Sequence, residues 1–212
     1  MYENLEEIKN AIIGGKHDQI EALVQNAIDA GADLKELIND GMIGAMDVVG
    51  QKYSRNEIYV PEMLVAAVTM KKGIDLINPL LKGDAKDSRG TIIMCTVKGD
   101  IHDIGKNLVI MMLQGAGFDV IDLGVDLSAE KVVEEVKKLK PNILGLSALL
   151  TTTMPEIKTV IDVLKTQGLR DSVKVMVGGA PVNQEWADKV GADGYGADAG
   201  QAVDVARKLM AA

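Results

Sequence analysis

Five short apolar runs, separated by longer amphipathic stretches, are the feature of this sequence that most restricts its fold. The runs are TIIMCTV, FDVIDL, NILGLSAL and VKVMVGG, followed by a weaker DGYG. Strands of a parallel sheet are buried on both faces and joined by crossover helices, which gives this composition and spacing. The second half of the chain therefore predicts a doubly wound α/β domain with a five-stranded parallel sheet and right-handed crossovers.

The first half has a different rhythm, because its apolar residues recur at helical spacing. Asp33 and Glu36 form a candidate capping box, and Pro61 suits the first turn of a helix. The polar stretch 82–90 predicts a linker between a helical-bundle domain, 1–88, and the α/β domain, 89–212. The predicted helices of the bundle lie near residues 3–13, 17–30, 33–53 and 60–81.

Charge and composition exclude several classes of protein. The formal net charge is −8, whereas nucleic-acid and anionic membrane surfaces attract clusters of Lys and Arg. The N-terminus carries acids where a signal peptide would be basic, and no apolar run is long enough to span a bilayer. The single cysteine, Cys95, lies within an apolar run, which predicts a buried thiol in a reducing compartment. We expect a cytoplasmic protein that binds neither nucleic acid nor membrane.

One of the two histidines lies directly after the first predicted strand, in the stretch KGDIHDIGKN. His102 is flanked there by Asp100 and Asp103 and is followed by Gly105. An imidazole in this setting fits a metal ligand, a catalytic base or a solvated polar loop. The other histidine, His17, has no such partners and is expected on the surface.

Polar and glycine-rich loops follow the other predicted strands as well. Ser147 to Thr153 follows the third strand, Gly178 and Gly179 end the fourth, and 191–200 surrounds the fifth. In a sheet of order 2-1-3-4-5, the first and third strands are neighbours at the switch point. The loops that carry His102 and Ser147 should then face one cleft. Two simpler interpretations stay open: the glycines form a tight turn, and Ser147 and Thr151 cap a helix that begins near Pro155.

The order and spacing of these residues resemble a known signature. It consists of Asp100, His102 and Gly105, then Ser147 and Leu149, then Gly178 and Gly179. In this the chain is similar to the cobalamin-binding module of methionine synthase and to the corrinoid proteins of corrinoid-dependent methyltransferase systems. The resemblance extends to the helical half, which resembles the four-helix cap of that module. It implies a Rossmann-like fold with flavodoxin-type strand order beneath a helical-bundle cap.

The resemblance implies that His102 is the axial cobalt ligand of a corrinoid bound base-off and His-on. The second ring nitrogen of such a ligand needs an acceptor that fixes the tautomer, and Asp100 is the candidate. Thr153 falls where the family more often has a serine. Its hydroxyl would extend the chain of hydrogen bonds that runs from His102 to Asp100. These three residues are implied to form a proton relay that couples methyl transfer to proton uptake.

Other residues are implied to surround the cofactor. Gly105, Gly178 and Gly179 would leave room for the displaced nucleotide tail, and Ser147 and Thr151 would donate hydrogen bonds to it. Further contacts are implied for Asp103, Ile104, Val125, Asp126, Leu149, Tyr195 and Ala197, and for Met63 of the bundle. The methionines of the bundle are nevertheless expected mainly as core residues.

The implied function is that of a methyl carrier that catalyses nothing alone. It would accept a methyl group on cobalt from a substrate-specific, barrel-fold methyltransferase acting on a methylamine, a betaine, methanol or an aryl methyl ether. A second methyltransferase would pass the methyl group to a pterin or thiol, and an ATP-dependent reactivase would restore oxidised cobalt. This places the chain in anaerobic one-carbon metabolism, in methanogenesis or acetogenesis. The donor depends on the partner, so the sequence does not specify it.

Three other classes of protein combine a similar α/β fold with a different function. The small cobalamin-binding subunit of an adenosylcobalamin-dependent mutase is the main alternative, because it uses the same histidine motif. A light-sensing transcription regulator is disfavoured by the acidic balance. A phosphoacceptor signalling domain would need an acidic cluster after the first strand and a lysine after the fifth, and the sequence lacks both.

Overall fold

The computed structural model describes residues 4–80 and 88–211. The chain forms two compact units. Unit 1 comprises Met1–Ser88 with Gln114–Gly117, and unit 2 comprises Arg89–Leu113 with Phe118–Ala212. Most of the predicted linker, 82–90, lies outside the described residues. Within the described part of the chain, no helix is both long enough and apolar enough to cross a membrane.

Unit 1 is helical, as predicted. The predicted third helix, 33–53, is α3, η1 and α4, which follow one another without a break. Its central part, η1, is a π-helix, which the sequence periodicity did not predict. The elements are α1 (Leu5–Ile13), α2 (Ile20–Asp29), α3 (Leu34–Glu36), η1 (Leu37–Ile43), α4 (Gly44–Ser54), α5 (Val60–Ile77) and the 3-10 turn η2 (Asn78–Leu80).

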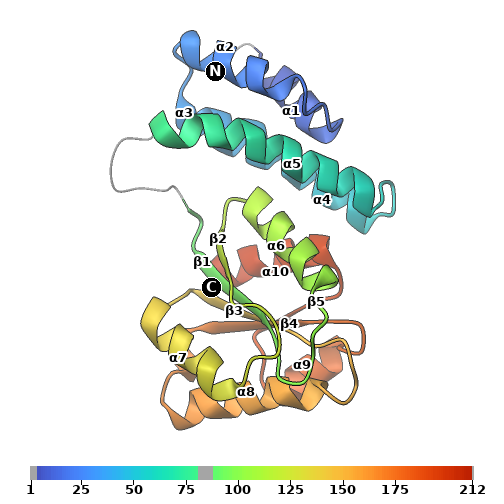
Figure 1. Ribbon diagram of the computed structural model, residues 1–212, viewed down its shortest axis with the longest axis vertical. Coiled ribbons are helices and arrows are strands. Elements are labelled where there is room, and N and C mark those ends of the chain that lie inside the picture. The colour runs from blue at the N-terminus through green and yellow to red at the C-terminus, as the bar shows by residue number, and fades with distance from the viewer. Residues whose placement is uncertain (1–3, 81–87, 212) are drawn as a thin grey trace. The chain divides into compact units, whose positions relative to one another are not determined.

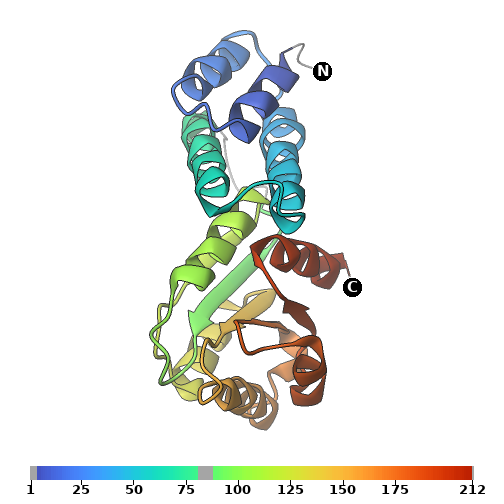
Figure 2. The ribbon, with the colours of Figure 1, turned by 90° about the vertical axis from the view of Figure 1, so that its right-hand side faces the viewer.

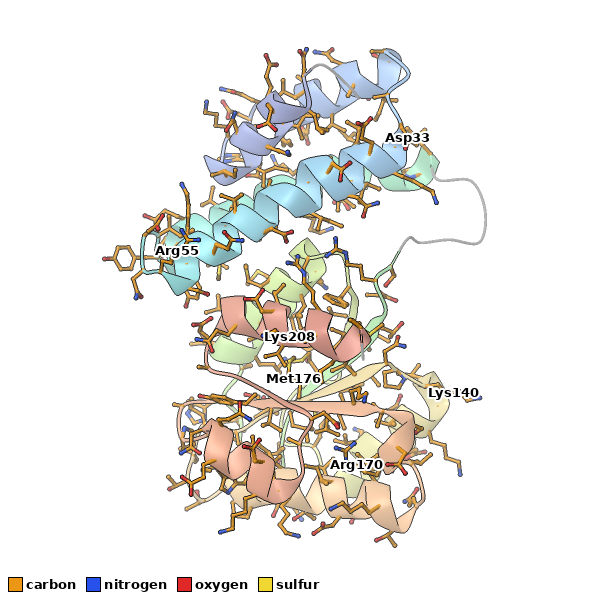
Figure 3. All side chains as sticks on the ribbon, turned by 180° about the vertical axis from the view of Figure 1, so that it is seen from behind. Asp33, Arg55, Lys140, Arg170, Met176 and Lys208 are labelled. Atoms are coloured by element: carbon orange, nitrogen blue, oxygen red, sulfur yellow. The ribbon has the colours of Figure 1, made fainter. Side chains whose placement is uncertain are left out.

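Local sequence signals set the ends and the packing of these helices. Asp33, labelled in Figure 3, accepts hydrogen bonds from the backbone N–H groups of Lys35 and Glu36, so the predicted N-cap is confirmed. Gly73 of α5 allows close packing, because a Cβ there would lie 2.9 Å from Cε of Met42 and 3.3 Å from Ile20 of α2. The core of unit 1 is aliphatic and rich in methionine.

Unit 2 contains the predicted five-stranded parallel sheet, in the predicted order β2-β1-β3-β4-β5. In Figure 1, α6 and α10 lie on one face of the sheet, and α7, α8 and α9 lie on the other; Figure 2 shows the same layers after a quarter turn. The strands are β1 (Thr91–Thr96), β2 (Asp119–Asp122), β3 (Ile143–Ser147), β4 (Lys174–Gly178) and β5 (Gly194–Gly196). The helices are α6 (Ile104–Gly115), α7 (Ala129–Leu139), α8 (Met154–Thr166), the 3-10 turn η3 (Arg170–Ser172), α9 (Gln184–Val190) and α10 (Ala199–Ala211).

Alternate residues of the central strands fill the core of unit 2. Ile93 and Cys95 of β1 belong to the cluster that α7, α8 and α9 cover, together with valines and leucines of β3 and β4. Cys95 is fully buried, as predicted, and burial raises the pKa of its thiol to about 12. The thiol is therefore a core group that stays protonated.

The amino edge of the sheet is closed by hydrogen bonds between side chains and backbone. Asn142 Oδ1 accepts from the Thr91 N–H at 2.9 Å, which joins β1 to the start of β3. The Arg170 guanidinium, labelled in Figure 3, lies 2.7 Å from Asp193 Oδ2 and donates to the Gly191 carbonyl at 2.7 Å. Asp193 Oδ2 also accepts from the Val175 N–H. The polar groups of Asn142, Arg170 and Asp193 are thus hydrogen-bonded to other parts of the protein.

Candidate functional site

The carboxyl ends of the strands lie level with one another. Thr96 pairs with Ser147, Ser147 with Gly178, and Gly178 with Gly196. The loops that follow β1, β3, β4 and β5 therefore begin at one edge of unit 2, as the strand order predicted. This edge is where ligands bind in open α/β sheets.

His102 lies in the loop between β1 and α6, with its side chain 47% exposed. The ring nitrogen Nδ1 lies 2.7 Å from Asp100 Oδ1, and the backbone N–H of His102 donates to the same oxygen at 3.1 Å. Because a carboxylate only accepts, Nδ1 carries the proton in this pair. The other ring nitrogen, Nε2, is then left with its lone pair available to a ligand.

Asp100 is fully buried and accepts hydrogen bonds on both carboxylate oxygens. Oδ2 accepts from the Leu149 N–H at 2.7 Å and from the Thr153 hydroxyl at 2.8 Å. Burial alone would raise the pKa of Asp100, but the hydrogen bonds from Leu149, His102 and Thr153 outweigh it and hold this pKa well below its usual range. The carboxylate stays ionised and fixes the orientation of the imidazole.

Thr153 occupies the N-cap position of α8, but no side chain caps this helix. Its hydroxyl instead donates to Asp100 and lies 3.0 Å from the Leu150 carbonyl oxygen. The simpler interpretation, in which Ser147 and Thr151 cap the helix near Pro155, receives no support from this geometry. The arrangement His102–Asp100–Thr153 is a continuous chain of hydrogen bonds.

Large exposed apolar side chains lie on either side of the histidine in the sequence and in the loop after β3. Ile101 and Ile104 are 75% and 78% exposed, and Leu149 and Leu150 are also exposed. Gly105 adds open space, because a Cβ placed there would meet no atom within 4 Å. Exposed apolar side chains grouped in this way mark a binding surface more often than a solvated one.

The donor set fits a cofactor that brings most of its metal ligands with it. Among the described residues, His, Cys, Asp and Glu form no group of three that could hold a metal ion. A metal held by the protein alone would need such a group. A corrinoid supplies the equatorial ligands of its cobalt, so one imidazole and a broad apolar surface suffice. The residues present therefore fit this cofactor.

Close packing of the backbone requires glycine at positions 178 and 179. Gly179 has φ +124°, and a Cβ there would lie 1.8 Å from the Ala148 carbonyl oxygen. A Cβ on Gly178 would lie 3.0 Å from the Gly196 carbonyl oxygen. Gly179 thus permits close approach of the loop after β3, and Gly178 permits close approach of the end of β5. The hydrogen bond from the Val182 N–H to the Gly179 carbonyl oxygen agrees with the interpretation as a tight turn. The role of both glycines beside a nucleotide tail stays a prediction.

The other predicted contacts occupy varied positions. Val125 is half-buried, and Tyr195 of β5 is half-buried and packs against the core of unit 2. Met63 of α5 belongs to unit 1, where it is 1% exposed, and its contact with a cofactor also stays a prediction. Asp103, Asp126, Thr151 and Ala197 are exposed, and Ser147 is half-buried at the end of β3.

Two interactions near the histidine were missed by the sequence analysis. Asp126 Oδ1 accepts from the Gly99 N–H at 2.7 Å. The Lys106 ammonium is buried and lies 2.6 Å from Asp122 Oδ1. Lys106 and Ile110 share the buried stripe of α6, so helical periodicity could have revealed this lysine. The hydrogen bond between Gly99 and Asp126 has no counterpart in the periodicity of the sequence.

Comparisons with known proteins identify the family of this chain. Two families, each described as a B12 binding domain, match the chain over residues 90–204 and residues 4–78. A corrinoid protein of Desulfitobacterium hafniense is 43% identical over 97% of this chain and 97% of its own length. Dimethylamine corrinoid protein 1 of Methanosarcina acetivorans is 43% identical over 99% of this chain and 98% of its own.

A solved structure has the same fold. The crystal structure of the methanol:cobalamin methyltransferase complex MtaBC from Methanosarcina barkeri contains a chain that is 36% identical, with a TM-score of 0.84. The match covers 96% of this chain and 78% of that one. The predicted resemblance is therefore confirmed, and this chain belongs to the family of B12-binding corrinoid proteins.

Proposed function

We propose that this protein is a methyl carrier and that His102 holds its corrinoid base-off and His-on. The observation that carries the proposal is the half-exposed ring of His102, whose Nδ1 is bound to a buried carboxylate while Nε2 is free for a metal. When bound, the corrinoid would supply a cobalt ion that carries a methyl group from one methyltransferase to another. The protein would supply one ligand to the cobalt and an apolar surface that contacts the corrinoid.

Each residue of the hydrogen-bonded chain has a defined task. Asp100 keeps the proton on Nδ1 and thereby keeps the lone pair on Nε2. Thr153 and the Leu149 N–H hold Asp100 in place and keep it ionised. The relay of His102, Asp100 and Thr153 would couple methyl transfer to proton uptake, because the lone pair of Nε2 is free once this nitrogen no longer holds the cobalt.

We propose a small methylated compound as the methyl donor. A full-length relative is named for dimethylamine and the related structure for methanol, which supports this class. The proposed partners are a substrate-specific barrel-fold methyltransferase, a second methyltransferase that acts on a pterin or thiol, and an ATP-dependent reactivase. The names of these relatives favour a methyl carrier over the small subunit of a mutase.

Reconstitution with hydroxocobalamin tests the proposal. The protein should bind one cobalt per chain, and His102→Ala should weaken binding by roughly a hundredfold or more, because loss of a ligand costs at least as much as loss of a group that only orients one. The matched control is His17→Ala, because His17 is exposed and lies outside the site. Equal affinity and equal visible spectra for the His102→Ala protein and the wild type would contradict axial ligation.

The carrier role has its own test. The methylcobalamin-loaded protein should lose its methyl group to a thiol or pterin acceptor only when a second methyltransferase is added. The reduced, cofactor-loaded protein should in turn accept a methyl group from dimethylamine or methanol only through the matching methyltransferase. Loss of methyl to the acceptor at the same rate without any partner would contradict a carrier that catalyses nothing alone.

A further inference from the structure

Two reciprocal hydrogen bonds join the loop after β2 to the loop that carries the histidine. The Gly99 N–H donates to Asp126 Oδ1 at 2.7 Å, and the Asp126 N–H donates to the Asp100 carbonyl oxygen at 3.0 Å. Asp126 therefore binds the backbone on both sides of the peptide bond that links Gly99 to Asp100. Asp100 is the residue whose carboxylate orients the His102 ring.

The backbone of Asp126 adopts an uncommon conformation. Its φ is +55°, in the left-handed region that side chains other than glycine, asparagine and aspartate rarely enter. The side chain is exposed, so core packing does not explain the choice of residue. Gly99, its partner, also has a positive φ of +78°. The conformation instead places the N–H and the carboxylate of Asp126 against the same loop.

Side chains of β1 and β2 hold the remainder of the loop that carries His102 and the start of α6. The Thr96 hydroxyl donates to the His102 carbonyl oxygen at 2.9 Å. At the start of α6, Lys106 binds Asp122 Oδ1, an oxygen that also accepts from the Gly124 N–H at 2.9 Å. The segment 122–126 thus holds the loop before and after the histidine. Of these anchors, only Asp126 binds the backbone of Asp100.

We propose that Asp126 is a positioning residue for the His102 ligand. By fixing Gly99 and Asp100 it sets the direction in which Nε2 points toward the metal of a bound corrinoid. It acts through hydrogen bonds to the loop, and its task is that of an acceptor oxygen rather than of a negative charge. This inference rests on the proposed role of His102, and it gives Asp126 a function that does not require contact with the corrin ring.

Two substitutions separate the acceptor from the backbone conformation. Asp126→Asn keeps an acceptor oxygen and tolerates a positive φ, whereas Asp126→Gly keeps the backbone freedom and removes the acceptor. The matched control is Lys140→Gly. Lys140, labelled in Figure 3, follows α7 in the same unit and has φ +48°, but it lies outside the site.

The first measurement needs no cofactor. Hydrogen exchange of the Gly99 amide should become roughly tenfold faster in Asp126→Gly, as expected when the acceptor of its hydrogen bond is lost. It should stay within about twofold of wild type in Asp126→Asn and in Lys140→Gly, because both keep the acceptor. An unchanged Gly99 amide in Asp126→Gly would overturn the proposal.

The second measurement uses proteins loaded with cob(II)alamin, in which electron paramagnetic resonance distinguishes His-on from His-off cobalt. The ratio of His-on to His-off should fall roughly tenfold in Asp126→Gly and be restored in Asp126→Asn. An unaltered ratio in Asp126→Gly, an equal loss in Asp126→Asn or a similar loss in Lys140→Gly would each overturn the positioning role. If the wild type itself showed no protein nitrogen on cobalt, the failure would be that of the proposed function.

Discussion

The two edges of the sheet in unit 2 use their polar side chains in opposite ways. At the amino edge, Arg170, Asp193 and Asn142 direct their polar groups to neighbouring side chains and backbone. At the carboxyl edge, His102 binds the protein through Nδ1 and leaves Nε2 available, and isoleucine side chains beside it are exposed. The polar groups at the amino edge therefore serve stability alone, whereas His102 at the carboxyl edge keeps one ring nitrogen available to a ligand.

The contrast has a local cause. The groups that donate to the Asp100 carboxylate come from the loops after β1 and β3, which are neighbouring strands at the switch point. The imidazole is thus fixed from one side only. Substitutions on the two edges should consequently affect different properties of the protein.

The largest effect on stability is expected at the buried ammonium of Lys106. Asp122→Ala would leave this ammonium without its charged partner and should lower the free energy of unfolding by about 3 kcal/mol. Lys106→Met should cost less than half of that, because Asp122 is 40% exposed and can be hydrated. Urea unfolding of both variants measures the difference. Equal losses of unfolding free energy in the two variants would show that burial of the Lys106 ammonium does not set the cost of breaking the ion pair.

A smaller loss is expected at the amino edge. Arg170→Met removes the ion pair with Asp193 and two hydrogen bonds to carbonyl groups, and should lower the free energy of unfolding by about 2 kcal/mol. Its affinity for hydroxocobalamin, measured by absorbance titration, should equal that of the wild type. A clear loss of affinity would remove the distinction between the edges.

At the carboxyl edge, a substitution of Thr153 tests a single hydrogen bond, the one from its hydroxyl to Asp100. Thr153→Val keeps the shape of the side chain but removes the donor to Asp100, and should cost about 1 kcal/mol in the free energy of unfolding. Thr153→Ser keeps the hydroxyl and is the matched control. The Thr153→Val protein should also show an altered cobalt(II)/cobalt(I) reduction potential. If its potential matched that of Thr153→Ser, Thr153 would not act through Asp100.

The smallest effect concerns pH. The folded protein holds the pKa of Asp100 below its ordinary value, so the ionised carboxylate adds stability above the unfolded pKa of about 4. This contribution is lost as the pH falls through the unfolded value toward the lower folded one. Asp100→Asn should therefore lose less stability than the wild type between about pH 5 and 3. Parallel stability curves for the two proteins would contradict the assigned cause.

The sequence predicted the parts of this molecule that repeat or alternate. The five strands and the Asp33 cap follow from local patterns, and the strand order was implied by the family resemblance. The structure confirms all three. The π-helix between α3 and α4 was missed, because one additional residue per turn hardly changes an apolar pattern over seven residues.

The site was predicted in part. Asp100 and His102 are two residues apart, and Thr153 follows a neighbouring strand, so the strand order alone brings them to one edge. The bond from Gly99 to Asp126 joins loops 27 residues apart and depends on a left-handed backbone. No periodicity encodes such a contact, and only the folded loops reveal it.

Electron paramagnetic resonance of the cob(II)alamin-loaded protein tests the central claim most directly. The protein is labelled uniformly with the heavier nitrogen isotope, and the corrinoid is left unlabelled. Axial ligation by His102 predicts a doublet splitting of the cobalt lines from the labelled imidazole. A triplet from the unlabelled base of the corrinoid, or no nitrogen splitting, would contradict it.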